Sequence, residues 1–424
     1  MRAFLCRKKG KLMKILVIGK GGREHALALA CSKSKMCDAL FCAPGNPGMA
    51  QIGTCVPISD SDVEGLVSFA KENAIDLTIV GPEASLSLGV VDAFQKEGLK
   101  IFGPTKAATQ VESSKDFAKG IMQKHNIPTA AYQTFDTYEA AWQYVQDQGA
   151  PIVIKEDGLK AGKGVTVAQD LESAKEALEI AFDIPNNKVV IEECLVGFEY
   201  SLICLVHEHL VIPLEVAQDH KCVLDGDKGP NTGGMGSYSP VKKITPEIID
   251  ETIRTVLQPM ADAMCEEGVP FTGFLYGGLM LTQNGIKTIE FNARFGDPEA
   301  EVILCRLESD FVDAILKVMN NEEVKLQWTP KVSHGVVMAS TNYPASSTKG
   351  SVITNWQDRD AQIYHMGTKV NEDGNLVTDG GRVMMVVTLE DTLEQAFEHT
   401  YKEVKQIECK DLFYRSDIGR KDME

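Results

Sequence analysis

Short apolar runs alternate with helix-like segments over the first hundred residues. The run Lys14–Gly19 (KILVIG) is almost wholly apolar, as expected for a strand buried on both faces. Further predicted strands are Ala39–Cys42, Leu77–Val80 and Lys100–Phe102, and predicted helices are Val63–Asn73 and Gly89–Glu97. This alternation predicts an open parallel α/β sheet over about residues 13–112.

The pattern changes in the middle of the chain. Short β-like runs joined by glycine-containing turns occur at Pro151–Lys155, Gly164–Ala168, Lys188–Glu192 and Tyr200–Val206, with helical patterns at Thr137–Gln148 and Leu171–Phe182. Strands with helices to one side predict an α+β domain. A last segment, residues 323–424, has predicted strands at Gly335–Ser340 and Gly381–Thr388 and a predicted helix at Leu393–Ile407.

Composition and charge disfavour some classes of function. The 424 residues are 44% hydrophobic and 24% charged, which is typical of a soluble globular protein, and no apolar run approaches the roughly 18 residues of a membrane span. The net charge of −17 disfavours a general nucleic-acid binder. Anionic substrates must therefore be bound by local lysines, arginines and backbone N–H groups.

Eleven scattered cysteines, without close CxxC pairs, favour reduced thiols in the cytoplasm. Residues 1–12 are basic, and their apolar part is too short for a secretion signal. We expect these residues to be a disordered extension, or to result from a start site assigned too far upstream.

A glycine-rich turn, Gly19–His25, directly follows the first predicted strand. Its free N–H groups at a helix end suit a phosphate, although a plain turn explains the motif equally well. The dinucleotide fingerprint requires glycine at position 24, where Glu24 stands, so an NAD site is disfavoured.

Two further turns, residues 44–48 (PGNPG) and 81–83 (GPE), lie at the carboxyl ends of predicted strands, where open α/β sheets bind ligands. Glu83 could accept hydrogen bonds from ribose hydroxyls or an amine. Taken singly, each motif is better explained as turn chemistry.

The loop at residues 154–164 carries three glycines and three lysines between two predicted strands. Like charges repel in a solvated turn, whereas they suit phosphate oxygens, and the glycines allow close backbone approach. Acidic residues and an apolar residue then follow the next strand, at Glu192, Glu193, Leu195 and Glu199. They suit an adenine slot with hydrogen bonds to ribose, although an edge strand produces similar acidity.

Two later motifs are also candidates for substrate binding. The run Asp219-His220-Lys221 precedes a glycine-rich loop, residues 229–236, whose N–H groups suit an anion or a reacting carboxylate. This loop contains Asn231, Thr232, Gly233 and Gly234.

The most informative segment is Thr288–Glu299. On a strand, Glu290 and Asn292 share a face, and hard oxygen ligands held in this way fit Mg²⁺ carrying phosphates. Arg294 could hold the transferring phosphoryl group, and Asp297 could receive an ammonium group. A solvated edge strand is the alternative, but the clustering of these residue types favours function.

Together these motifs resemble the phosphoribosylamine–glycine ligase family, also called glycinamide ribonucleotide synthetases. The resemblance runs from Met13 to about Arg420, in the family's order, and includes GGREHA, PGNPG, GPE, GLKAGKG, QDHK, GPNTGGMGSYSP, GFLYGGLM, IEFNARFGDPE, GTK, GGR and FYRSDIG. The chain departs from the family's usual pattern at Ser85, Glu156 and Lys160, among others. None of these departures removes a group assigned to chemistry.

The resemblance implies an ATP-grasp fold: an N-terminal α/β domain (13–112), a two-part ATP-grasp domain (113–322) with a mobile subdomain at about 128–195, and a small C-terminal α+β domain (323–424). By position, ATP would be held by Lys115, Lys155, Asp157, Gly158, Gly162, Lys163, Gly164, Glu192, Glu193, Leu195 and Glu199. Glu290 and Asn292 would ligate Mg²⁺ or Mn²⁺, and Arg294, Asp297 and Lys155 would be catalytic. The phosphoribosyl end would lie among Gly21, Gly22, Arg23, Glu83, Lys369 and Arg382.

The implied reaction joins glycine to phosphoribosylamine through glycyl phosphate, with ATP as co-substrate, in purine biosynthesis. We expect a cytoplasmic monomer that acts on small molecules and binds neither nucleic acid nor membranes. The alternatives are an NAD-dependent oxidoreductase, a non-catalytic nucleotide sensor and another ATP-grasp ligase of the pathway. They are disfavoured, respectively, by Glu24, by intact Glu290, Asn292 and Arg294, and by the GPNTGGMG and FGDPE motifs.

Overall fold

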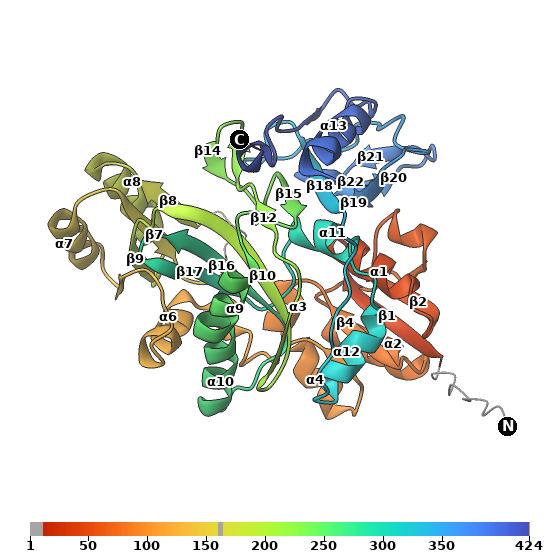
Figure 1. The fold of residues 1–424 in the computed structure, drawn as a ribbon, viewed down its shortest axis with the longest axis horizontal. Coiled ribbons are helices and arrows are strands. Elements are labelled where there is room, and N and C mark those ends of the chain that lie inside the picture. The colour runs from red at the N-terminus through yellow and green to blue at the C-terminus, as the bar shows by residue number, and fades with distance from the viewer. Residues whose placement is uncertain (1–11, 160–163, 424) are drawn as a thin grey trace.

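The computed structural model describes residues 12–159 and 164–423 (Figure 1). Except for Leu12, the expected N-terminal extension lies outside the described residues. No helix in the described ranges is long and apolar enough to cross a membrane.

The N-terminal part is an open, five-stranded parallel sheet, as the alternating pattern predicted. Its order is β3-β2-β1-β4-β5. The strands are β1 (Met13–Gly19), β2 (Cys37–Pro44), β3 (Thr54–Cys55), β4 (Leu77–Val80) and β5 (Ile101–Phe102). The helices are α1 (Gly22–Ser32), α2 (Val63–Glu72), α3 (Glu83–Ser87) and α4 (Val90–Lys96). Because β1 is central, the turns after β1, β2 and β4 meet at one edge of the sheet.

The central part contains two four-stranded antiparallel sheets. One has the order β6-β9-β7-β8 and consists of β6 (Tyr132–Phe135), β7 (Ile152–Glu156), β8 (Val165–Ala168) and β9 (Val189–Glu193). Helices α7 (Tyr138–Gln148) and α8 (Leu171–Phe182) pack on it around a separate apolar cluster. This small body projects to one side of the molecule (Figure 1).

The second central sheet has the order β11-β10-β16-β17 and consists of β10 (Gly197–His207), β11 (Leu210–Pro213), β16 (Thr272–Thr282) and β17 (Gly285–Asn292). Helices α6 (Lys115–Lys124), α9 (Pro246–Thr252) and α10 (Gln258–Glu266) lie in the same part of the molecule (Figure 1). A bridge between Thr129 and Thr288 and a hydrogen bond from Lys155 Nζ to the carbonyl of Ile289 join the two central sheets.

A further sheet, of six strands, supports the C-terminal part. Its order is β12-β15-β18-β22-β19, with β23 on β18. The strands are β12 (Gln218–Asp219), β15 (Gly236–Ser239), β18 (Val332–Ser340), β19 (Gln362–His365), β22 (Arg382–Glu390) and β23 (Leu412–Phe413). Helix α13 (Leu393–Val404) packs on β18 and β22. Since β12 and β15 come from the central segment, this sheet joins the C-terminal strands to loops that carry predicted substrate residues.

The remaining α-helices and β-strands are short. They are α5 (Gln110–Ser113), α11 (Glu299–Leu304), α12 (Phe311–Met319), and the hairpins β13 (Cys222–Leu224)–β14 (Lys228–Asn231) and β20 (Thr368–Val370)–β21 (Leu376–Thr378). Helix α11 packs against both α1 and the six-stranded sheet.

Candidate active site

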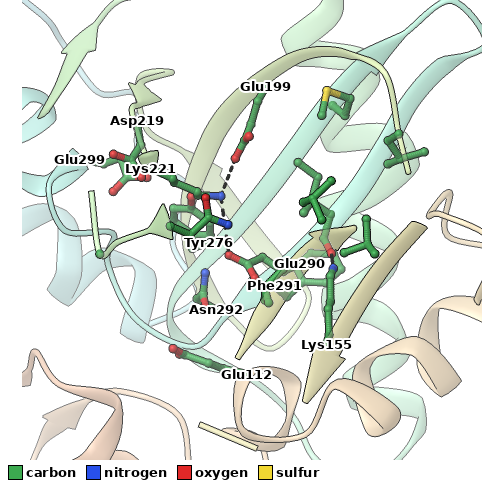
Figure 2. A pocket seen from close by; sticks show the side chains of 18 of the residues that line it. Glu112, Lys155, Glu199, Asp219, Lys221, Tyr276, Glu290, Phe291, Asn292 and Glu299 are labelled. Carbon is green, nitrogen blue, oxygen red and sulfur yellow. Dashed lines mark hydrogen bonds and ion pairs between the residues drawn. The ribbon is translucent and has the colours of Figure 1, made fainter. Parts of the chain in front are cut away.

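A cavity of about 810 Å³ lies where the central sheets meet loops from the N-terminal and C-terminal parts. Its apolar lining comes from both central sheets and includes Val153 on β7, Phe198 on β10 and Met280 on β16. The rest is strongly charged, as Figure 2 shows for the side chains around Lys221 and Glu290. The cavity can therefore hold a molecule with one flat apolar end and one anionic end.

Most residues predicted from the sequence line this cavity: Arg23, Glu83, Lys115, Lys155, Gly158, Gly164, Glu192, Glu193, Leu195, Glu199, Asp219, His220, Lys221, Asn231, Thr232, Gly233, Glu290, Asn292, Arg294, Asp297 and Arg382. Gly21, Gly22, Asp157, Gly234 and Lys369 are not among its lining residues. Gly162 and Lys163 lie outside the described residues.

Lys155 is fixed by a buried chain of charges. Its Nζ lies 2.9 Å from Glu192 Oε1, and Lys119 Nζ lies 2.9 Å from Glu192 Oε2. Burial lowers the pKa of Lys119 to about 8, although Glu192 acts in the opposite direction. Glu192 thus orients two ammonium groups from beneath the cavity. Lys119 was not predicted from the sequence.

Lys221 stands between two carboxylates in Figure 2. Its Nζ donates to Glu199 Oε1 at 2.5 Å and lies 3.9 Å from Glu290 Oε1. Burial alone would lower the pKa of Lys221, but Glu199, followed by other acidic neighbours, raises it well above its usual value. An ammonium group is therefore held permanently beside Glu290.

Glu290 and Asn292 have the chemistry of a hard-cation site. Burial alone would raise the pKa of Glu290, but Lys221, Lys155 and Lys115 lower it, so this carboxylate is ionised at neutral pH. Within residues 12–159 and 164–423, no group of three or more His, Cys, Asp or Glu is placed to hold a metal ion. Two protein oxygen ligands therefore fit a cation that takes its other ligands from phosphates and water, as Mg²⁺ usually does.

Arg294 is held between two carboxylates. Its Nη2 lies 3.1 Å from Glu112 Oε1, and its Nε lies 3.6 Å from Glu83 Oε2. Glu112 Oε2 also accepts from the N–H of Ala293 at 2.7 Å. Glu112 was not predicted from the sequence. It lies in a short polar helix, α5, and its role is visible only from its contact with a segment about 180 residues away.

Asp297 is tied to the C-terminal sheet. Arg382 Nη1 lies 2.9 Å from Asp297 Oδ1 and donates to the carbonyls of Asp297 and Gly233, at 2.8 and 2.7 Å. One guanidinium thus joins β22, the loop before α11 and the glycine-rich loop. Lys369 instead lies 3.5 Å from Asp379, with its side chain 52% exposed.

Asp219 and Glu299 form a second acidic group that lines the cavity. Burial and neighbouring Glu299 raise the pKa of Asp219 well above its usual value, and within the described chain Asp219 Oδ1 has no hydrogen-bond partner. Ser201 donates to Glu299 at 2.9 Å and contacts the hydroxyl of Tyr276. Glu299 and Tyr276 also line the cavity and were not predicted from the sequence. Such a cluster favours a cationic group beside it.

The first β–α turn is built differently from the phosphate loop that its glycines suggest. Glu24 Oε2 accepts from the N–H of Gly21 at 2.6 Å, and Arg23 Nε lies 2.5 Å from Glu24 Oε1. Gly22 packs against Glu301, since a Cβ at this position would lie 2.3 Å from Glu301 Oε1. In this structure the turn reaches the cavity through Arg23, whose Nη2 lies 3.7 Å from Glu83 Oε2.

The lysine- and glycine-rich loop is anchored at its start. Asp157 Oδ1 accepts from the N–H of Lys115 at 2.6 Å, so it satisfies the N-terminus of α6. Lys115 Nζ in turn donates to the carbonyl of Gly158 at 2.9 Å. The flanking Gly158 and Gly164 line the cavity.

Three models of the phosphoribosylglycinamide synthetase family match the chain. They are the N domain over residues 13–112, the ATP-grasp (A) domain over 113–300 and the C domain over 333–421. A phosphoribosylamine–glycine ligase from Halalkalibacterium halodurans is 48% identical over 416 residues, which cover 96% of this chain and 97% of that protein.

Solved structures agree with these matches. A crystal structure of phosphoribosylamine–glycine ligase from Thermotoga maritima has a TM-score of 0.84 and 31% identity, and the match covers 96% of this chain and all of that one. A biotin carboxylase from Campylobacter jejuni shares the fold with a TM-score of 0.70 at 14% identity, over 95% of this chain and 93% of that one. These likenesses bear out the prediction of an ATP-grasp fold.

Proposed function

The chain belongs to the phosphoribosylglycinamide synthetase family, and from this premise we propose that it is a phosphoribosylamine–glycine ligase. It joins glycine to 5-phosphoribosylamine with cleavage of ATP to ADP and phosphate, and the product, glycinamide ribonucleotide, serves purine biosynthesis. The observation that carries the proposal is the convergence of Lys155, Lys221, Glu290 and Arg294 in one cavity.

The chemistry requires activation of a carboxylate, whose oxygen is a poor leaving group. In the proposed route, a carboxylate oxygen of glycine attacks the γ-phosphorus of ATP, which gives glycyl phosphate and ADP. The amine of phosphoribosylamine then attacks the acyl carbon, phosphate leaves, and the amine loses a proton. Such transfers are accelerated mainly by positioning and by neutralising charge, which is what the paired cations of this cavity can provide.

ATP would lie between the two central sheets. The apolar side chains of Val153, Phe198 and Met280 offer a slot for adenine, beside Glu193 and Leu195. Lys115 and Lys155 would reach the phosphates, together with the loop that Gly158 and Gly164 flank and that contains Gly162 and Lys163. Glu192 is a positioning residue in this scheme, because it holds Lys155 at 2.9 Å.

Glu290 and Asn292 would hold the divalent cation, Mg²⁺ or Mn²⁺. When bound, the cation neutralises negative charge on the phosphate oxygens. Lys221, 3.9 Å from Glu290, lowers the pKa of this carboxylate and so keeps it in the ionised form that binds the cation. Arg294 would stabilise the transferring phosphoryl group, and Glu83 and Glu112 would keep its guanidinium in place.

The two remaining substrates would lie beyond the phosphates. The acidic side chains of Asp219, Asp297 and Glu299 suit the ammonium group of glycine, and the loop of Asn231–Gly234 with His220 would close that end. Phosphoribosylamine would bind near Arg23, Glu83 and Arg382, which line the cavity. The same substrate site in our assignment also includes Gly21, Gly22 and Lys369. We further propose that the enzyme is cytoplasmic and acts as a monomer. The ten free cysteines within the described ranges suit a reducing compartment such as the cytoplasm.

Coupled ADP release tests this proposal. The assay contains Mg²⁺, ATP, freshly formed phosphoribosylamine and glycine, and each is omitted in turn. We expect ADP release to depend strictly on both co-substrates and to be abolished in Glu290→Gln and Arg294→Ala. Glu97→Gln, which changes an exposed carboxylate paired with Lys71, is the matched control and should keep full activity. ADP release without phosphoribosylamine, or only with another amine or acid, would overturn the substrate assignment.

A further inference from the structure

Two cysteines outside the cavity face each other on the N-terminal sheet. Cys42 on β2 and Cys55 on β3 are direct partners in the parallel register. Cys42 is fully buried and Cys55 is half-buried. The two side chains also lie close together around Gly45, since a Cβ at that position would lie 2.4 Å from Cys55 Sγ and 3.0 Å from Cys42 Cβ, and Cys55 Sγ donates to the carbonyl oxygen of Asn46 at 3.6 Å.

We propose that Cys42 and Cys55 form a dithiol that closes to an intramolecular disulfide when it meets a low-molecular-weight disulfide. Neighbouring strands lie about 4.7–4.9 Å apart. This spacing lies within the Cα separation of roughly 4.4–6.8 Å that a disulfide requires. Gly45 leaves room for the sulfur, since a Cβ at that position would lie 2.4 Å from Cys55 Sγ.

The two thiols have different roles. The side chain of Cys42 lowers the pKa of half-buried Cys55, which favours the thiolate form of this thiol. The neighbouring side chain of Cys55, together with burial, raises the pKa of Cys42, which solvent does not reach. Cys55 is therefore the attacking thiol, and Cys42 is the resolving thiol.

The reaction is ordinary thiol–disulfide exchange. The thiolate of Cys55 attacks one sulfur of the external disulfide, which releases one thiolate and leaves a mixed disulfide on Cys55. Cys42 then loses its proton and attacks Cys55 Sγ, which releases the second external thiol. Overall, two protein thiols are oxidised to one disulfide, and one external disulfide is reduced to two thiols.

The pair lies directly beneath the loop that holds the first β–α turn. Asn46 Nδ2 donates to the carbonyl of Lys20 at 2.8 Å and to that of His365 at 2.9 Å, and the N–H of Gly45 donates to the carbonyl of Gly19 at 3.2 Å. Formation of the disulfide removes the contact from Cys55 to Asn46 and draws the Cys55 sulfur toward Cys42. The loop, and with it the turn that carries Arg23, must then shift.

A neighbouring pair provides a contrast. Cys31 and Cys37 are also near each other, but burial raises the pKa of both thiols, to well above the usual value for Cys31. Neither offers a thiolate at neutral pH, so neither should start the exchange. Cys37, half-buried like Cys55 and on the same strand as Cys42, is a suitable control.

Oxidised glutathione added to the full-length protein tests the dithiol by mass spectrometry. Wild type and Cys37→Ser should lose two hydrogen atoms and yield a cross-linked peptide of Cys42 and Cys55. Cys42→Ser keeps a side-chain donor beside Cys55 but lacks the resolving thiol, so it should instead accumulate a glutathione adduct on Cys55, and Cys55→Ser should acquire neither product. Absence of the cross-link in the wild type, or a cross-link at another cysteine pair, would overturn the proposal.

The functional consequence rests on the proposed ligase activity and is measured separately. The KM for phosphoribosylamine should rise roughly tenfold on oxidation, which corresponds to about 1.4 kcal/mol of lost binding when Arg23 is displaced, while the KM for ATP is retained. Dithiothreitol should reverse the change. In Cys55→Ser, the KM for phosphoribosylamine should not change when oxidised glutathione is added. A cross-linked enzyme with unchanged KM would refute the coupling to the turn. Failure of the ligase assignment would leave the thiol mapping unaffected.

Discussion

At the scale of single residues, the cavity is organised by cations held between carboxylates. Lys221 lies between Glu199 and Glu290, and Arg294 lies between Glu83 and Glu112. Each arrangement limits the side-chain freedom of a long cation before any substrate arrives. This preorganisation is the main way in which the chain can accelerate a phosphoryl transfer.

Glu112 provides the sharpest single-residue prediction. In Glu112→Gln, the amide can still accept from the N–H of Ala293 but no longer pairs with Arg294, which is then free to turn toward Glu83. We expect kcat to fall roughly tenfold, with little change in the KM for ATP, because the guanidinium is misplaced. Steady-state kinetics would measure this. Glu97→Gln should match the wild type, and an undiminished kcat in Glu112→Gln would show that Glu83 alone suffices.

Sequence reasoning found the residues whose type and motif indicate chemistry, and missed those that act through long-range contacts. Lys155, Glu290 and Asn292 were predicted and line the cavity. Lys119, Glu112 and Tyr276 were missed, because nothing near them in the chain indicates which distant side chain they contact. Asp157 is bonded to the N-terminus of α6 and Lys369 lies outside the cavity, so their roles toward substrate stay predictions.

At the scale of elements, strong local signals gave accurate bounds. Helix α8 has the predicted bounds, because Asp170 and Ser173 cap it reciprocally and an apolar stripe follows. Strand β4 also has the predicted bounds, as a wholly buried apolar run. Strands β3, β12 and β15 are two to four residues long and were missed, since only their partners in the sheet make them strands.

The packing of α1 gives a prediction at this scale. Gly22→Ala would bring a methyl group within 2.3 Å of Glu301 Oε1 and 2.9 Å of Met366 Cγ, both on buried side chains. We expect a loss of about 1–3 kcal/mol in the free energy of unfolding from this overpacking. Gly120→Ala, on α6 with open space around it, should instead gain about 0.5–1 kcal/mol. Denaturant titration of both variants checks this, and equal effects would contradict the packing of α1.

At the scale of the whole molecule, the N-terminal and C-terminal parts meet through buried histidines. The N–H of His365 on β19 donates to His25 Nδ1 on α1 at 3.0 Å. Burial lowers the pKa of His25 to about 3 and that of His365 to about 4. Both imidazoles are therefore neutral in the folded protein over a range where the unfolded chain is protonated.

This contact makes stability depend on pH in a definite direction. Between pH 6.5 and 4, these two histidines bind more protons in the unfolded chain than in the folded protein, so their contribution to the free energy of unfolding falls as the pH falls through this window. In His25→Gln, the free energy of unfolding should change less steeply with pH between pH 6 and 4.5. The difference in slope should correspond to about one proton fewer taken up on unfolding. Urea unfolding at several pH values measures the slope. The wild-type slope in His25→Gln would contradict a neutral, buried His25.

Activation of a carboxylate by phosphorylation in this cavity can be followed with labelled oxygen. Glycine with ¹⁸O in both carboxylate oxygens is converted with ATP and phosphoribosylamine, and the released phosphate and the amide are analysed by mass spectrometry. We predict one ¹⁸O in each phosphate and one ¹⁸O retained in each amide, because the attacking oxygen leaves with the phosphoryl group. Unlabelled phosphate accompanying a labelled amide would contradict the glycyl phosphate route and the roles assigned to Arg294 and Glu290.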